Sequence, residues 1–137
     1  MEVNRSFVID TNAYSAFKRG DEEAVEVIIK AESIIFSSIV LGELLAGFSL
    51  GSRYKKNLEE LREFLDESKV LFLSVNAQTS EAYANIYKML RENGTPIPTN
   101  DMWIAAMAMQ LDLPVFTYDA HFEKVNGLEI VRSVQDF

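Results

Sequence analysis

Short apolar runs, alternating with longer segments of helical periodicity, constrain the fold of this chain more than any other feature. The runs "SFVID", "SIIFSS", "KVLFL", "LPVFTY" and "LEIV" are rich in strand-forming residues and show no clear polar–apolar alternation. Strands of that kind are buried on both faces, as in a parallel sheet covered by helices. We therefore predict an α/β fold with a mostly parallel central sheet of about five strands.

Helical spacing of apolar residues separates nearly all of these runs. It predicts helices over residues 21–31, 39–48, 53–66 and 77–92, one through "TNDMWIAAMAMQ", and a short helical piece at "DAHFEK". "ENGTP" provides a Gly stop with Pro just beyond it after the 77–92 segment. No linker, repeat or low-complexity segment interrupts the pattern, so we expect a single three-layer domain over residues 1–137.

Four acidic residues lie where such a sheet binds ligands, beyond the carboxyl ends of its strands. Asp10 ends the first strand and Asp119 follows the fourth. Glu43 lies in the apolar helix after the second strand, and Asp101 opens the helix that leads into the fourth. Each has an ordinary structural explanation, because Asp10 and Asp119 can cap helices and Asp101 suits a helix N-terminus. Together they predict a shared site at one edge of the sheet.

Glu43 and Asp101 are the hardest of the four to explain as surface charges. Apolar residues flank Glu43 on both sides, and Asp101 begins a helix that is apolar all round, so we expect both to be buried. Buried carboxylates need partners, and clustered ones repel one another unless a cation offsets their charge. Oxygen ligands without Cys and with a single His favour Mg²⁺ or Mn²⁺.

The charge balance argues against a tight, non-specific binder of nucleic acid. The net charge is −8, so phosphate contacts would depend on local basic residues, namely Lys18, Arg19, Arg53, Lys55 and Lys56. The absence of Cys fits a reducing compartment, and "MEVNRSFVID" has no leader pattern, so we expect a cytoplasmic protein. The apolar window around Glu43 fits a buried strand and helix better than a membrane span, because a charge inside a bilayer is costly.

The four acidic positions lie in segments that resemble a known family. "VIDTN", "SSIVLGELLAG", "TPIPTNDMWIAAMA" and "FTYDAHFEKVNGLEIV" are similar, in order and spacing, to the signature blocks of PIN-domain proteins. The "DTN" opening and the "GELLAG" block look most like the VapC-type toxins of toxin–antitoxin pairs. Matched position by position, the acidic cluster is Asp10, Glu43, Asp101 and Asp119. Thr117 matches a hydroxyl that accompanies the fourth acid, and Asn12 matches a polar residue after the first.

This resemblance implies a metal-dependent ribonuclease that is held in check by a cognate antitoxin and is commonly a homodimer. It implies that Asp10, Glu43, Asp101 and Asp119 bind Mg²⁺ or Mn²⁺ at the catalytic site, with Glu43 as ligand or general base. Thr117 and Asn12 would orient ligands or contact a phosphate of the RNA substrate. No membrane association is implied.

Three alternatives remain open at the level of sequence. A Mg²⁺-dependent DNA nuclease would use the same residues. A phosphoacceptor or phosphatase domain also puts acids at strand ends, but "VIDTN" offers neither an adjacent acid pair nor Asp-x-Asp. A non-catalytic interaction module should lack an acid, and none is missing. We further expect His121, the only histidine, to be a half-exposed loop residue, and Trp103 to contribute to core packing rather than to stack on a base.

Overall fold

The computed structural model describes residues 5–137; residues 1–4, which begin the stretch without a leader pattern, lie outside the described residues. Within that range five strands form one sheet: β1 (Ser6–Ile9), β2 (Ser33–Ser37), β3 (Val70–Leu73), β4 (Val115–Phe116) and β5 (Ile130–Val131). The helices found in the same residues are α1 (Thr11–Lys18), α2 (Glu22–Lys30), α3 (Ser38–Ser49), α4 (Tyr54–Leu65), α5 (Ala77–Asn93), α6 (Thr99–Leu111) and the 3-10 helices η1 (Ala120–Lys124) and η2 (Val134–Asp136). The predicted α/β class is confirmed.

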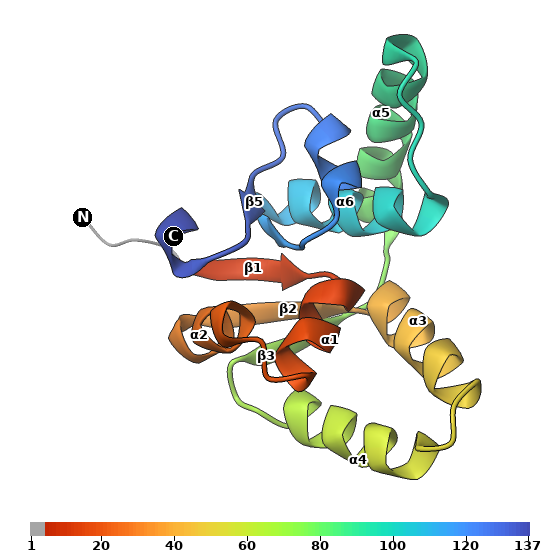
Figure 1. Cartoon of the computed structure of the whole chain (residues 1–137). Helices are drawn as coiled ribbons and strands as arrows, with labels where there is room; N and C mark the ends of the chain where they lie inside the picture. The colour runs from red at the N-terminus through yellow and green to blue at the C-terminus, as the bar shows by residue number, and fades with distance from the viewer. Residues whose placement is uncertain (1–4) are drawn as a thin grey trace.

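The sheet is parallel throughout, with the strand order β3-β2-β1-β4-β5 (Figure 1). β2 and then β3 are added on one side of β1, and β4 and β5 are added later on the other side of β1. The strand order therefore reverses between β1 and β4. In open α/β sheets, the crevice at such a reversal, beyond the carboxyl ends of the strands, is where ligands bind.

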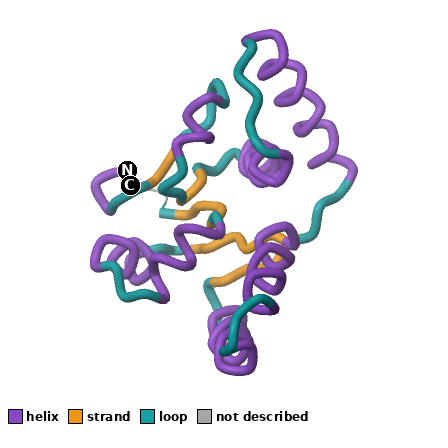
Figure 2. Tube along the Cα trace, turned by 45° about the vertical axis from the view of Figure 1, so that its right-hand side comes forward, coloured by secondary structure: helices purple, strands orange, loops and turns teal. Residues whose placement is uncertain are grey.

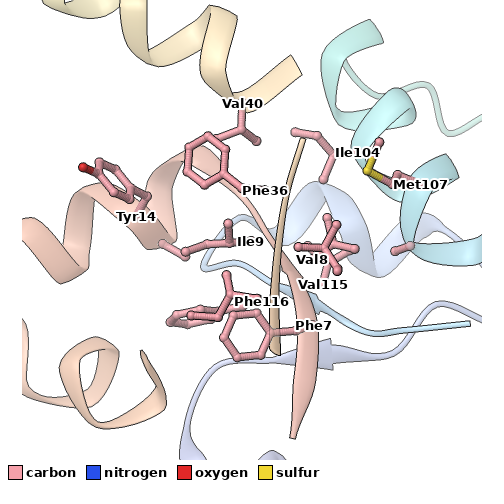
Figure 3. Packing of buried hydrophobic residues seen from close by; sticks show 14 of the residues in the cluster. Phe7, Val8, Ile9, Tyr14, Phe36, Val40, Ile104, Met107, Val115 and Phe116 are labelled. Atoms are coloured by element: carbon pink, nitrogen blue, oxygen red, sulfur yellow. The ribbon is translucent and has the colours of Figure 1, made fainter. Parts of the chain in front are cut away.

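Side chains that alternate along β1 form the core on both faces of the sheet. Val8 and Val115 lie toward Ile104 and Met107 of α6, whereas Phe7, Ile9 and Phe116 lie on the opposite side (Figure 3). In the tube view α6 lies end-on above the strands, and α4 lies below them (Figure 2). Strands covered on both faces explain the continuous apolar runs in the sequence.

Four elements differ from the sequence prediction: α1, β4, β5 and the short 3-10 helix η2, which was not predicted. α1 was not predicted, because its eight residues carry too few apolar positions to show a helical period. It is stabilised by the Asp10 N-cap and by Tyr14, whose ring makes edge contacts with Phe36 and Phe64. β4 and β5 have two residues each, shorter than the runs that predicted them, because the backbone turns away beyond Phe116 and Val131 into the site and η2.

The expectation that α3 is buried on all sides is wrong. Only Val40 and Leu44 of this helix are fully buried, while Gly42, Ala46 and Gly47 are exposed. Glu43 is accordingly half-buried rather than buried. Several residues of this apolar segment are small glycines and alanines, which can face solvent at little cost. One side of α3 is therefore exposed to solvent next to the acids.

Lys69, the residue before β3, forms hydrogen bonds with the C-terminal end of α2. Its Nζ donates to the backbone oxygens of Ile28, Ile29 and Ala31, at 2.5, 3.2 and 3.3 Å. These carbonyls are at the C-terminal end of α2, where a positive charge is favourable. Replacing Lys69 with Met should lower the free energy of unfolding by about 1–2 kcal/mol, measured by urea denaturation. Lys88→Met is the control, because Lys88 is 78% exposed and only faces Glu92; equal losses in both variants would refute the capping role.

Candidate active site

The reversal point between β1 and β4 holds the first predicted site residue. Asp10 directly follows β1, and its backbone N–H donates to the oxygen of Phe116 in β4, at 3.0 Å. Thr117 follows β4 and is fully buried, and its hydroxyl donates to Asp10 Oδ2 at 2.7 Å. Two strands that run side by side thus deliver a carboxylate and a hydroxyl into hydrogen-bonding contact.

Asp10 is a buried carboxylate with an altered proton affinity. It is 4% exposed, and Oδ1 accepts the backbone N–H of Thr11 at 2.8 Å. Burial raises the pKa of Asp10 to about 6, with smaller contributions from repulsion by Asp101 and Glu43; hydrogen bonds from Thr117 and Thr11 oppose the rise. The rise shows that burying the ionised carboxylate is costly, a cost that a nearby cation would offset.

Glu43 is joined to Asp10 through Thr11. The Thr11 hydroxyl donates to Glu43 Oε1 at 2.8 Å, while its backbone N–H donates to Asp10. One residue at the start of α1 therefore orients acids that lie 33 positions apart in the sequence. Sequence reasoning missed Thr11, although its position inside "DTN" was visible.

The carboxylates of the other two acids, Asp101 and Asp119, both lie close to the imidazole of His121. Asp101 lies in the first turn of α6, and Asp119 caps η1 by accepting the backbone N–H of His121 at 2.9 Å. The Nδ1 atom of His121 lies 2.9 Å from Asp101 Oδ2 and 3.1 Å from Asp119 Oδ1. Within residues 5–137 these three side chains form the one group whose ligand atoms all lie within 4.8 Å of one another.

Thr117 and Asn12 connect the two pairs of acids. The Thr117 hydroxyl, which donates to Asp10, also accepts the backbone N–H of Asp119 at 3.0 Å. Asn12 Oδ1 accepts the backbone N–H of Tyr118 at 3.0 Å and so holds the segment after β4 against α1. Both residues lie at the predicted site, and the contacts that the structure gives them are to the protein's own chain.

The carboxylate of Asp101 interacts electrostatically with acids of both pairs. Burial raises its pKa, as do repulsion from Asp119 and Glu43, while the contact with His121 lowers it. Asp10 in turn is repelled by Asp101 and Glu43. The six predicted residues therefore form one continuous cluster, in which Asp101 is shared by an Asp10–Glu43 side and an Asp119–His121 side.

The donor set of this cluster fits a hard divalent cation. Across the described residues, no Lys or Arg forms an ion pair with Asp10, Glu43, Asp101 or Asp119. Four carboxylates, raised pKa values at two of them and no compensating lysine or arginine leave room for a cation with oxygen ligands.

An open groove reaches Glu43. It has a volume of about 520 Å³ and runs between α3 and the start of α6; its lining residues are Ser38, Ile39, Gly42, Glu43, Ala46 and Asn100. A Cβ atom added at Gly42 would meet nothing within 4 Å, so the space beside this residue is open. The exposed side of α3 therefore gives a large substrate access to Glu43.

Two side chains with rings lie near the site: the indole of Trp103 and the imidazole of His121. Trp103 is half-buried and stacks on Tyr83 of α5, with ring centroids 4.0 Å apart, so it packs α6 against α5 but lies outside the buried core in which we expected it. His121 is 41% exposed, as expected, but its contact with two acids was not foreseen. The spacing "DAH" was the available signal, because a residue two places after a capping Asp is close to its carboxylate.

Comparison with known proteins places this geometry among related chains. A family model described as "PIN domain" matches residues 7–128. The chain is 31% identical over 127 residues to a Rickettsia felis protein named Ribonuclease VapC2, with 89% of this chain and 93% of that protein covered. It is 26% identical over 128 residues to Ribonuclease VapC5 of Mycobacterium tuberculosis, with 91% and 93% covered.

Solved structures agree with these relatives. DNA-bound VapBC from Salmonella typhimurium superimposes with a TM-score of 0.81 at 28% identity, covering 92% of this chain and 96% of that chain. VapBC-5 from M. tuberculosis, described as a member of the VapBC family of toxin–antitoxin systems, gives a TM-score of 0.74 at 28% identity, covering 93% and 98%. The similarity extends over nearly the full length of both proteins.

Proposed function

This chain belongs to the PIN domain family, and from that premise we propose that it is a Mg²⁺- or Mn²⁺-dependent endoribonuclease, the toxin of a toxin–antitoxin pair. The observation that carries the proposal is the convergence of Asp10, Glu43, Asp101 and Asp119, without a pairing lysine or arginine among the described residues. The relatives named as VapC ribonucleases support the choice of RNA as substrate.

Two positions in the cluster are suited to cations. Asp10, Glu43 and Asp101 would hold one ion, and Asp101 and Asp119 would hold a second. The shared position of Asp101 supports this division, because repulsion reaches it from both Glu43 and Asp119. When bound, the ions would offset negative charge on the scissile phosphate and lower the pKa of the attacking water.

The chain's own residues hold these ligands in place. Thr117 fixes one oxygen of Asp10, and Thr11 fixes the other oxygen together with one oxygen of Glu43. The carboxylates of Asp10 and Glu43 are therefore oriented before an ion binds, which lowers the cost of assembling the site. Glu43 lines the groove, where it serves either as a ligand or as the base that takes a proton from water.

Charge outside the cluster favours selective RNA binding. Lys18 and Lys56 both approach Glu60, at 3.8 and 4.0 Å, which offsets part of their positive charge. Arg19, Arg53 and Lys55, the other three basic residues singled out from the sequence, are exposed and are available for phosphate contacts. With a net charge of −8, the protein should bind a structured cytoplasmic RNA better than it binds arbitrary sequence.

A nuclease assay tests the proposed function. Purified protein should cut tRNA or mRNA internally when Mg²⁺ or Mn²⁺ is present and should be inactive in EDTA. Single-stranded DNA is the comparison substrate, because the alternative DNA nuclease would use the same acids. Cleavage of DNA alone, or cleavage of RNA that persists in EDTA, would contradict the proposal.

The exposed apolar corner between α3 and α4 supports a partner surface. Leu50 is 90% exposed, Tyr54 is 41% exposed and Phe48 is half-buried beside them. Exposed apolar surface of this kind marks contact sites. We propose that a cognate antitoxin and a second copy of this chain are the partners, as the toxin–antitoxin description of the M. tuberculosis relative supports.

The homodimer gives a measurable expectation. Without antitoxin, light scattering should find a dimer at high micromolar concentration. Leu50→Asp should weaken self-association by at least about tenfold, the effect of losing one anchoring side chain of an interface. Met109→Asp is the control, because Met109 is 40% exposed but lies at the far end of α6. A parent protein that stays monomeric would contradict the dimer.

A further inference from the structure

His121 adds a nitrogen donor to a cluster for which the family resemblance provides only oxygen atoms. Its Nδ1 lies 2.9 Å from Asp101 Oδ2 and 3.1 Å from Asp119 Oδ1. An ion that binds six ligands at about 2.1 Å holds neighbouring ligand atoms about 3 Å apart. The separations between the imidazole nitrogen and both carboxylate oxygens therefore match adjacent positions around one ion.

The position of the imidazole is determined by the backbone around it. Asp119 accepts the backbone N–H of His121, and Thr117 accepts the backbone N–H of Asp119. Phe122, the next residue, is fully buried and anchors η1 in the core. Because His121 follows a capped turn and precedes a core residue, little freedom is lost when its ring binds an ion.

The exposures of the three side chains suit an ion that exchanges with solvent. Asp101 is 13% exposed, Asp119 33% and His121 41%. A partly exposed ligand set can admit an ion and still leave coordination positions for substrate oxygens. The buried Asp10, by contrast, already receives a hydrogen bond at each of its two oxygens.

We propose that Asp101, Asp119 and His121 form a mixed nitrogen–oxygen metal site that prefers Mn²⁺ to Mg²⁺, next to an oxygen-only position at Asp10 and Glu43. The proposal rests on the metal dependence proposed above and assigns His121 a role as ligand. Imidazole favours first-row transition ions, whereas carboxylate and water ligands suit Mg²⁺. In the alternative arrangement, His121 only donates a hydrogen bond to the two acids and makes no contact with an ion.

Pulsed electron paramagnetic resonance of bound Mn²⁺ distinguishes the two arrangements without an activity assay. The chain contains one histidine, so any imidazole-nitrogen coupling in protein without an affinity tag must come from His121. We expect nitrogen modulation in the parent and none in His121→Gln, whose amide keeps a hydrogen-bond donor. Calorimetry should show Mn²⁺ affinity falling at least about tenfold in His121→Gln, as losses around metal ligands do, with Mg²⁺ affinity within about twofold of the parent.

A second variant tests the preference between ions. His121→Asp should bind a divalent ion without nitrogen coupling and should shift its preference toward Mg²⁺. Mn²⁺ bound to the parent without nitrogen modulation would overturn the role of His121 and leave the proposed metal dependence intact. A parent that binds no Mn²⁺ at millimolar concentration would overturn both.

Discussion

Replacing Asp101 with Asn is expected to abolish RNA cleavage and to leave the metal-free protein at least as stable as the parent. Asn keeps the shape of the side chain but removes the charge that both cation positions share. A bound ion contributes several kcal/mol to a phosphoryl-transfer transition state, so activity should fall at least about a thousandfold. In EDTA one source of repulsion with Asp119 and Glu43 is gone, so the melting temperature should stay the same or rise.

The competing explanation of Asp101 makes the opposite prediction. If its carboxylate only favours the N-terminus of α6, the change should cost about 0.3–1 kcal/mol and leave cleavage intact. Asp112→Asn is the matched control at the other end of the same helix. Asp112 has a φ of 54°, a conformation that Asn tolerates, so both stability and activity should be preserved there. An active Asp101→Asn protein, or one that is inactive because it does not fold, would contradict the ligand role.

Asp10→Asn should stabilise the metal-free protein at alkaline pH. The pKa of Asp10 is raised to about 6 from an ordinary 3.8, so folding favours the protonated form. Its contribution to stability is fully present below pH 3.8 and is lost as the pH rises through about 6. A shift of this size corresponds to roughly 3 kcal/mol, part of which Asn forfeits because it cannot accept both hydrogen bonds of the carboxylate.

Urea denaturation in EDTA between pH 4 and pH 8 measures this effect. At pH 8 Asp10→Asn should be about 1–3 kcal/mol more stable than the parent, and the difference should vanish near pH 4. Adding Mn²⁺ should reverse the order, because the ion binds the native parent and stabilises it. Asp112→Asn should follow the parent at every pH. A parent whose metal-free stability is flat across this range would show that Asp10 carries no unfavourable buried charge.

The sheet and most helices were predictable from the pattern of apolar residues. Strands buried on both faces are continuous apolar runs, and helices with one buried face show apolar residues at helical spacing. β1 and β2 are continuous apolar runs, and α5 shows its Gly94 stop at the predicted position. The position of Asp10 at the ligand-binding edge followed from the rule that ligands bind beyond the carboxyl ends of the strands, whereas Thr117 was identified from the family resemblance. α1 was missed because eight residues that include three alanines or serines carry little periodicity.

The parts that sequence could not supply depend on which side of an element faces solvent. α3 reads as apolar throughout, yet Gly42 and Ala46 line the groove, and Glu43 is open to it. The contact of His121 with Asp101 joins residues from η1 and α6, 20 positions apart, and no local pattern predicts it. Thr11 acts through two hydrogen bonds whose partners become visible only once α1 and α3 are side by side.

The central claim is that these carboxylates are gathered around divalent cations. Anomalous diffraction from crystals soaked in Mn²⁺ tests it most directly, because it locates the ion independently of activity. We expect a peak within about 2.0–2.6 Å of an Asp101 carboxylate oxygen, with further ligands from Asp10 and Glu43 or from Asp119 and His121. A map with no peak among these residues at saturating Mn²⁺ and neutral pH would contradict the claim.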